Sequence, residues 1–195
     1  MTGTPTDFCS LDEIIVSPGF ASREQAERAQ CAEAEAVLAL SSVLAHSPDQ
    51  ALQRLVDLAM EGTGAESCGI SLEEEDEAGR YLRWIATAGE FSRYINGTMP
   101  REFSPCGTAI DRREPVVMRD PVRYYAYISQ LHAPVRTVLL VPFARGGKLV
   151  GTLWAGAHTS ARTFTYSDLR YVRHLTDFAS DVLDAFSSPL HDDPV

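Results

Sequence analysis

The sequence lacks any apolar run approaching the roughly 20 residues that a membrane-spanning helix needs. Its opening stretch, MTGTPTDFCSLDEIIV, has neither a basic region nor a long apolar segment, so no secretory signal is predicted. Basic residues are also scarce, with 17 Lys and Arg against 27 Asp and Glu and a net charge of −10. Such a surface repels phosphate backbones and anionic lipid, so we expect neither nucleic acid nor membrane as a partner.

Cysteine is scarce as well. The four cysteines, Cys9, Cys31, Cys68 and Cys106, form no CxxC pair and are irregularly spaced. This usage is typical of a reduced cytoplasmic protein rather than of a disulfide framework. None of the five histidines stands at metal-ligand spacing from a cysteine, so no metal site is predicted.

What the sequence does have is enough apolar residues, 45%, for one packed core. We expect a loosely held N-terminal arm over residues 1–21 and a helix over 22–47, opened by a capping box at Ser22 and Gln25. A single domain follows over 48–186, and a frayed tail covers 187–195.

Within the domain, the hydrophobic period changes along the chain. An apolar stripe with helical spacing predicts a helix from about residue 48, ended by Gly62 and Gly64. Residues 66–89 read as two strands around an acidic turn, with Leu82, Trp84 and Ala86 on one face. Ser104 and Pro105 predict a short helix, Gly146-Gly147 a hairpin turn, and Thr165 the start of a last helix.

This order predicts an α+β fold with a mostly antiparallel central sheet flanked by helices. Four strings, YLRWIATAGE, PCGTAIDRREPVVMRD, TVLLVPFARGGKLVGTLWAG and FTYSDLRYVRHLTDFAS, resemble in order and spacing the GAF domain family. The resemblance covers about residues 48–186. It implies a GAF-like fold with an irregular helical insert, about residues 91–135, over one sheet face and a pocket beneath it.

The resemblance also implies a function. GAF domains are mostly small-molecule sensor or regulatory modules of bacterial signalling proteins, including two-component systems, and they form homodimers through their first and last helices. The seam formed by Val172, Leu175, Ala179, Val182 and Phe186 could pair with another helix in that way. A module that only dimerises or binds other proteins, with no ligand, is an alternative.

The ligand in the implied pocket is unidentified, and the insert supplies most of its candidate contacts. The ligand-binding candidates are Trp84, Phe103, Cys106, Tyr124, Tyr125, Tyr127 and His132. A cluster of aromatic residues can equally well be part of the hydrophobic core. These rings therefore either line a pocket or close the core over the sheet. Arginines also gather in and around the insert, where they either attract an anionic ligand or form a paired, solvated face.

An enzyme resembling free methionine-(R)-sulfoxide reductase is a further alternative. Cys106-Gly107 resembles its Cys-Gly, but the segment RYYAYISQLHAPVRT has none of the further cysteines found there. No Cys-His pair exists to hold a bilin covalently, and we do not expect haem on the lone His132. No catalytic residue is assigned, and a non-catalytic role is favoured.

Cys106 itself admits two interpretations. In the first turn of a helix, an accessible thiol would have a lowered pKa and be reactive. Buried against the sheet beside Gly107, it would pack as a small apolar residue with a raised pKa. Because free cysteine is so often buried, we favour the packing role, in which Cys106 lines or supports the pocket.

Overall fold

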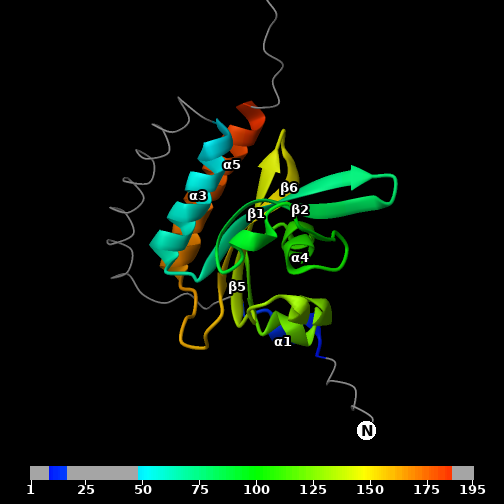
Figure 1. The fold of residues 1–195 in the computed structure, drawn as a ribbon, viewed down its shortest axis with the longest axis vertical. Helices are drawn as coiled ribbons and strands as arrows, with labels where there is room; N and C mark the ends of the chain where they lie inside the picture. The colour runs from blue at the N-terminus through cyan, green and yellow to red at the C-terminus, as the bar shows by residue number, and fades with distance from the viewer. Residues whose placement is uncertain (1–8, 17–47, 186–195) are drawn as a thin grey trace, which may run out of the picture.

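The computed structural model describes residues 9–16 and 48–185, drawn in colour in Figure 1. The predicted helix over 22–47, the tail over 187–195 and Phe186 of the predicted seam lie outside the described residues. Among the residues described, no helix combines the length and the apolar character needed to cross a lipid bilayer.

One six-stranded sheet forms the centre of the molecule (Figure 1). Its strands lie in the order β3-β2-β1-β6-β5-β4, and every neighbouring pair is antiparallel. The predicted α+β fold with a mostly antiparallel sheet is therefore confirmed. The strands are β1 (Ser67–Asp76), β2 (Gly79–Gly89), β3 (Thr98–Pro100), β4 (Val116–Arg119), β5 (Thr137–Arg145) and β6 (Lys148–Ala157).

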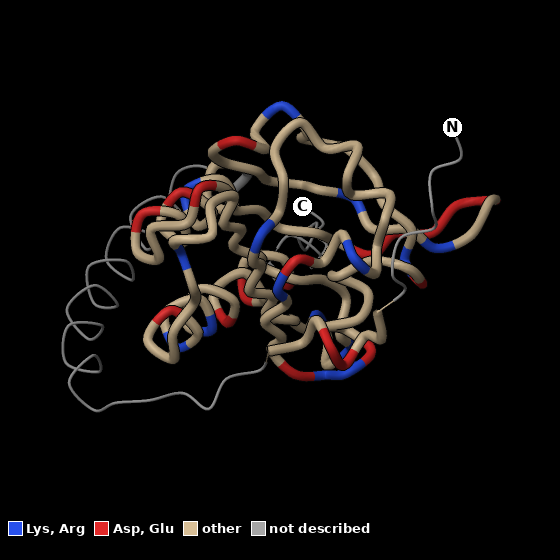
Figure 2. Tube along the Cα trace, turned by 90° about the horizontal axis from the view of Figure 1, so that it is seen from below, with Lys and Arg blue, Asp and Glu red and all other residues tan. Residues whose placement is uncertain are grey.

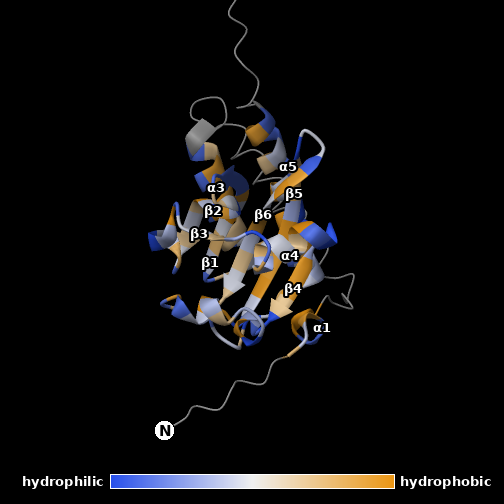
Figure 3. Cartoon of the chain, turned by 90° about the vertical axis from the view of Figure 1, so that its right-hand side faces the viewer, coloured by the Kyte–Doolittle hydropathy of each residue, from blue (hydrophilic) through white to orange (hydrophobic). Residues whose placement is uncertain are grey.

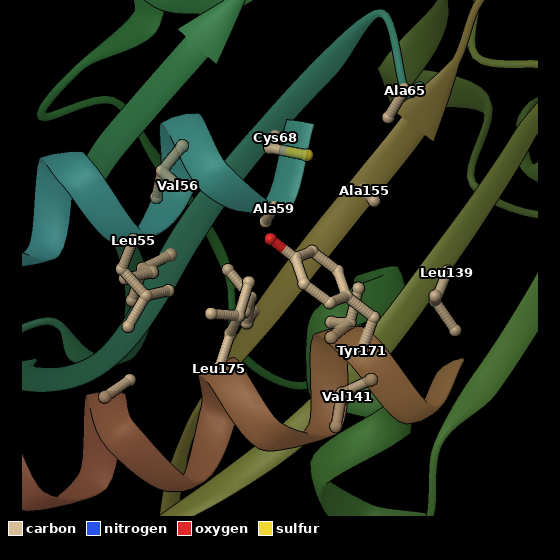
Figure 4. Packing of buried hydrophobic residues seen from close by; sticks show 14 of the residues in the cluster. Leu55, Val56, Ala59, Ala65, Cys68, Leu139, Val141, Ala155, Tyr171 and Leu175 are labelled. Carbon is tan, nitrogen blue, oxygen red and sulfur yellow. The ribbon is translucent and has the colours of Figure 1, made fainter. Parts of the chain in front are cut away.

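Two long helices, α3 (Pro48–Thr63) and α5 (Tyr166–Ala185), cover one face of the sheet. Figure 4 shows their apolar side chains packed against β1, β5 and β6. The Tyr171 hydroxyl reaches across to α3 and donates to the Leu58 carbonyl oxygen at 3.1 Å. Gly62 lies within α3, and its missing side chain leaves room for the Tyr171 ring, which stands where a Cβ would be. The helix ends just before Gly64, whose φ is +62°.

The predicted seam of α5 faces the chain's own core. Val172, Leu175, Ala179 and Val182 are all almost fully buried. Most of them pack with Leu55 and other residues of α3 and the sheet in one cluster. The core of the chain itself therefore explains why these residues are apolar, and their pattern is no longer an argument for a dimer interface along α5.

The insert covers the opposite face of the sheet. It consists of η1 (Ser92–Tyr94), α4 (Pro105–Arg112), η2 (Pro121–Arg123) and η3 (Ala126–Gln130) with their connections. Figure 3 looks onto this face, where α4 lies over β5 and β6. As predicted, Ser104 is the N-cap of α4, with its hydroxyl accepting from the Gly107 N–H at 3.0 Å, and Pro105 is the first helical residue.

The described part of the N-terminal arm is packed, not loosely held. Helix α1 (Leu11–Ile14) places Ile14 at 0% exposure in the core on the insert side. Ile15 forms an isolated antiparallel bridge to Met118, and the Val16 N–H donates to the Val117 carbonyl at 2.9 Å. The apolar run therefore binds along the edge strand β4, where it pairs otherwise free backbone groups.

A β-bulge changes the faces of β2. The pairing register shifts between Ile70 and Ser71, so that Ser71 is opposite Trp84, Ile70 is opposite Ala86, and Ile85 has no partner of its own. Trp84 consequently faces the insert, while Ala86 packs under α3 and α5. The predicted common face of Leu82, Trp84 and Ala86 is wrong for Ala86, because a bulge reverses the alternation beyond it.

Candidate ligand cavity

A cavity of about 390 Å³ lies between the sheet and the insert. Its volume falls within the usual range for small-molecule sites. The sheet and the loops beside it contribute Trp84, Phe91, Tyr94, Gly97, Thr98, Met99, Val138, Leu140, Trp154 and Gly156. The insert wall adds Pro105, Cys106, Pro121, Tyr127, Ile128, Gln130, Leu131 and Val135.

The sheet side of the cavity is an aromatic wall. Trp84 of β2 and Trp154 of β6 lie on the same face of the sheet, on either side of β1, with their ring centroids 5.1 Å apart. Phe91 stacks on Trp84 at 5.9 Å with an interplanar angle of 14°. The indole of Trp154 fits over β1 because Gly69 has no side chain, since a Cβ there would lie 2.4 Å from the ring. The small residue on β1 thus makes room for the ring beside it.

None of the lining residues carries a charge: the set contains no Asp, Glu, Lys, Arg or His. Three of the lining side chains nevertheless hold a buried donor that has no hydrogen-bond partner among the described residues. These donors are Nε1 of Trp84, Nε1 of Trp154 and the Tyr127 hydroxyl. The cavity wall is therefore apolar and uncharged, with a few polar groups left unsatisfied.

Cys106 lies in the insert wall, on the first turn of α4, and is 4% exposed. Its sulfur is 3.4 Å from the Ser71 hydroxyl of β1. Burial raises the pKa of the Cys106 thiol, and hydrogen bonding with Ser71 only partly offsets that effect. Cys68 packs on the other face of the sheet and cannot meet Cys106. This geometry fits the packing role and an unreactive thiol.

Only some of the predicted ligand contacts meet at the cavity. Trp84, Cys106 and Tyr127 line it. Phe103 does not, because it is 45% exposed and its ring packs on Tyr125 at 5.1 Å on the outside of the insert. Tyr124 lies beside the same pair, with its ring 4.8 Å from that of Tyr125.

Tyr125 supports the insert from within. It is 1% exposed and its hydroxyl is 2.5 Å from the Thr108 hydroxyl of α4. Burial raises the pKa of Tyr125 to about 12, and the hydrogen bond with Thr108 opposes that shift. For Tyr125 the alternative of core packing describes the structure better than a place in the cavity wall, and Phe103 and Tyr124 pack against it from the outside of the insert.

His132 stands at the rim rather than in the lining. Its backbone N–H donates to the Tyr94 hydroxyl at 2.9 Å, and its Nε2 is 3.3 Å from a Glu90 carboxylate oxygen. Its ring also packs edge-on against Phe91 at 5.9 Å. These contacts tie the end of the insert to the loop that holds the aromatic wall.

His158 fixes the same end of the insert from the other side. Its Nδ1 is 2.9 Å from the Pro134 carbonyl oxygen and its Nε2 is 3.0 Å from the Ser67 hydroxyl. The Glu66 carboxylate accepts from the His158 N–H at 2.6 Å. That bond, followed by the bonds from the N–H and hydroxyl of Thr159, lowers the pKa of Glu66 against the opposing effect of burial. The two histidines thus position the cavity wall.

The arginines around the insert are largely paired. Arg101 is buried, and it donates to Glu73 of β1 and to Asp111 of α4, at 2.7 Å for the latter. Burial disfavours its charge, but the bonds to Asp111 and Glu73 outweigh that cost and raise the pKa of Arg101. Further pairs join Arg112 to Asp12, Arg123 to Glu13 and Arg136 to Asp120. No arginine lines the cavity, which supports a paired face and not an anion site.

The surface as a whole shows the same pairing. Figure 2 shows acidic and basic segments close together on several loops and on the projecting β1–β2 hairpin. On that hairpin, Glu74 binds Arg83 at 2.8 Å. Across residues 9–16 and 48–185, no group of three or more His, Cys, Asp or Glu is placed to hold a metal ion.

Comparison with known proteins gives a consistent result. A family model described as GAF domain matches residues 45–184. No curated protein matches the chain. The GAF domain of a phosphoenolpyruvate-protein phosphotransferase from Acinetobacter is similar at TM-score 0.65 and 16% identity, covering 88% of this chain and 100% of that one.

Two other solved structures are similar to a comparable degree. A GAF domain from a phosphoenolpyruvate-protein phosphotransferase of Coxiella burnetii has TM-score 0.66 and 18% identity, over 80% of this chain and 95% of that one. Free methionine-R-sulfoxide reductase from Neisseria meningitidis, in complex with its substrate, has TM-score 0.64 and 20% identity, over 87% and 96%. At these identities the likeness concerns the fold alone.

Proposed function

The chain belongs to the GAF domain family, and we propose that it is a sensor or regulatory domain whose signal is a small molecule bound in the cavity between sheet and insert. The observation that carries this proposal is the cavity itself. It is lined by two tryptophans, Phe91 and Tyr127, and none of its lining residues carries a charge. A wall of this composition is typical of ligand sites.

The way the insert is held supports a signalling role. His132 ties its end to the loop after β2, and the contact between the Pro134 carbonyl oxygen and His158 ties it to the end of β6. Leu131 and Val135 line the cavity and flank the residues that make these contacts, so a ligand that displaces them would also displace His132 and Pro134. Occupancy of the cavity would thereby be transmitted to the end of β6, from which the chain leads into α5.

Three finer parts of the proposal rest on the family resemblance. The domain works in the cytoplasm, it serves a bacterial signalling pathway such as a two-component system, and it pairs as a homodimer through residues 22–47, where the sequence predicts a helix, and α5. Sedimentation of the purified chain tests the last part. A 21.4 kDa monomer at micromolar concentration would contradict it.

The test of the proposed function is a metabolite screen by thermal shift, followed by native mass spectrometry of the hits. A genuine hit must change tryptophan fluorescence, because the chain has only two tryptophans and both line the cavity. Thr98→Phe places a ring at the exposed edge of the cavity and should abolish the response. Thr163→Phe, an exposed position outside the cavity, is the matched control. Hits that survive Thr98→Phe would refute the assignment of the site.

A sulfoxide reductase is the second candidate, favoured by the place of Cys106 in the cavity wall. The raised pKa of Cys106 and the position of Cys68 on the other face of the sheet speak against it. Reduction of free methionine sulfoxide by the parent protein, lost in Cys106→Ala, would establish the enzyme instead.

A further inference from the structure

The first described segment of the chain, residues 9–16, lies against both the edge strand β4 and the insert (Figure 3). We call this segment the strap. On the sheet side, Ile15 bridges to Met118 of β4, and the Val16 N–H donates to the Val117 carbonyl oxygen at 2.9 Å. The strap is therefore joined to the sheet by one isolated bridge, whereas β4 pairs with β5 along its whole length.

On the insert side, two ion pairs hold the strap. Asp12 binds Arg112, the last residue of α4, at 2.9 Å. Glu13 lies 3.8 Å from Arg123, the last residue of η2. Both α4 and η2 contribute residues to the cavity wall, while none of the strap's own residues lines the cavity. The strap thus contacts the elements that enclose the cavity from outside it.

One buried side chain joins the two sets of contacts. Ile14 is 0% exposed and belongs to the apolar cluster under the insert. The same cluster contains Met118 of β4 and Ile128 of η3, which lines the cavity. Cys9 is the only other buried residue of the strap. The apolar attachment of the strap therefore depends mainly on Ile14.

So few contacts make the strap a unit that can open by itself. Helices α3 and α5, by contrast, bury many apolar side chains in the cluster on the other face of the sheet. A segment with few buried contacts detaches at a lower free energy than the core does, and the rest of the domain stays folded when it opens. The exposed ion pairs to Arg112 and Arg123 add little to its attachment.

We propose that the strap is a detachable clamp. While it is docked it holds the insert against the sheet, and when it detaches the insert is free to move away from the cavity. This inference deepens the proposed function and rests on it, because access of a ligand to the cavity then depends on residues 9–16. Linkage requires the converse as well: a ligand that binds only beneath the closed insert must also stabilise the docked strap.

Two variants detach the strap by different means. Ile14→Asp places a charge in the apolar cluster, and Val16→Pro removes the N–H that donates to Val117. Amide hydrogen exchange of the full chain, followed by mass spectrometry, measures opening segment by segment. In both variants, exchange in α4 and in residues 121–130 should be about tenfold faster than in the parent protein, or more. Exchange in α5 should stay at the parent rate.

Acrylamide quenching of tryptophan emission gives a second readout, because the chain has only two tryptophans and both line the cavity. Quenching should be stronger in both strap variants than in the parent protein. Ile95→Asp makes the same substitution as Ile14→Asp at a side chain that is 44% exposed, and it should leave exchange in α4 unchanged.

Two results would overturn the inference. One is exchange in the insert that stays at the parent rate in both variants. The other is equal acceleration in α5, because the strap would then be part of the common core and would not open by itself. Neither measurement needs a bound ligand. The inference can therefore fail while the proposed function, which the metabolite screen tests, still stands.

Discussion

Two tyrosines of η3 and its N-cap, Tyr125 and Tyr127, should respond in opposite ways to loss of the hydroxyl. The Tyr125 hydroxyl is paired with Thr108 at 2.5 Å, whereas the Tyr127 hydroxyl is buried with no partner among the described residues. Removing one member of a buried pair leaves the other unsatisfied, at a cost of about 1–3 kcal/mol. A buried hydroxyl that has no partner already costs the folded state free energy, and removing it removes that cost.

We therefore expect Tyr125→Phe to lower the free energy of unfolding by about 1.5 kcal/mol and Tyr127→Phe to raise it by about 1 kcal/mol. For a chain of this size, each kcal/mol corresponds to roughly 2–4 °C in melting temperature. The difference between the two variants should thus reach about 5–10 °C. Both substitutions keep the ring, so packing is unchanged and only the hydroxyl is tested.

Urea unfolding of the two variants, followed by circular dichroism without ligand, measures this difference. Tyr124→Phe serves as the control for the same segment. A loss of stability above about 1 kcal/mol in Tyr127→Phe would show that its hydroxyl already has a partner.

Three other expectations concern the support of the cavity. Arg101→Met should cost about 3 kcal/mol in urea unfolding because it leaves the buried carboxylate of Glu73 with only its longer pairs to Arg80 and Lys148, at 3.5 and 4.0 Å. Arg54→Met, in an exposed pair, should cost under about 0.5 kcal/mol; equal costs would refute the buried pair. Glu66→Gln should destabilise the protein at pH 7. Since the pKa of Glu66 is lowered in the fold from its ordinary 4.5, its contribution is present above that pH and is lost as the pH falls through the lowered pKa. The stabilities of the two proteins should therefore converge on acidification, and a gap that stays constant as the pH falls would contradict this. Cys106 should resist iodoacetamide at pH 8 until the chain is unfolded, because burial raises the pKa of its thiol; rapid labelling of the folded protein, located by mass spectrometry, would reverse the packing assignment.

The parts of the fold that follow a local rule could be predicted from the sequence. The Gly146-Gly147 turn joins β5 to β6, and Ser104 with Pro105 starts α4. Each depends on the backbone preferences of a few neighbouring residues. The mostly antiparallel sheet flanked by helices was also predicted, from the order of the elements and the resemblance to the family, and the observed strand pairing confirms it.

The membership of the cavity wall could not be predicted in the same way. The three tyrosines at 124, 125 and 127 lie around 3₁₀ turns, where neither the strand period nor the α-helical period tells which ring faces inward. Phe91 was missed because it stands in a loop, and Trp154 because its place opposite Leu140 requires the strand register. The alternation along β6 places Trp154 on the opposite face of the sheet from Leu153 and Ala155. This pattern was visible in the sequence, but it does not show which of the two faces the insert covers.

The central claim, that the space between sheet and insert binds a small molecule, is tested most directly by photochemical attachment of benzophenone, an uncharged probe with two aromatic rings. Under near-ultraviolet light the bound probe attaches to C–H groups that it touches, and peptide mapping by mass spectrometry locates the adducts. The account predicts adducts on cavity residues such as Met99, Ile128 and Leu131, and their loss in Thr98→Phe. Adducts confined to the exposed apolar residues Ile95, Phe103 and Tyr166 would contradict it.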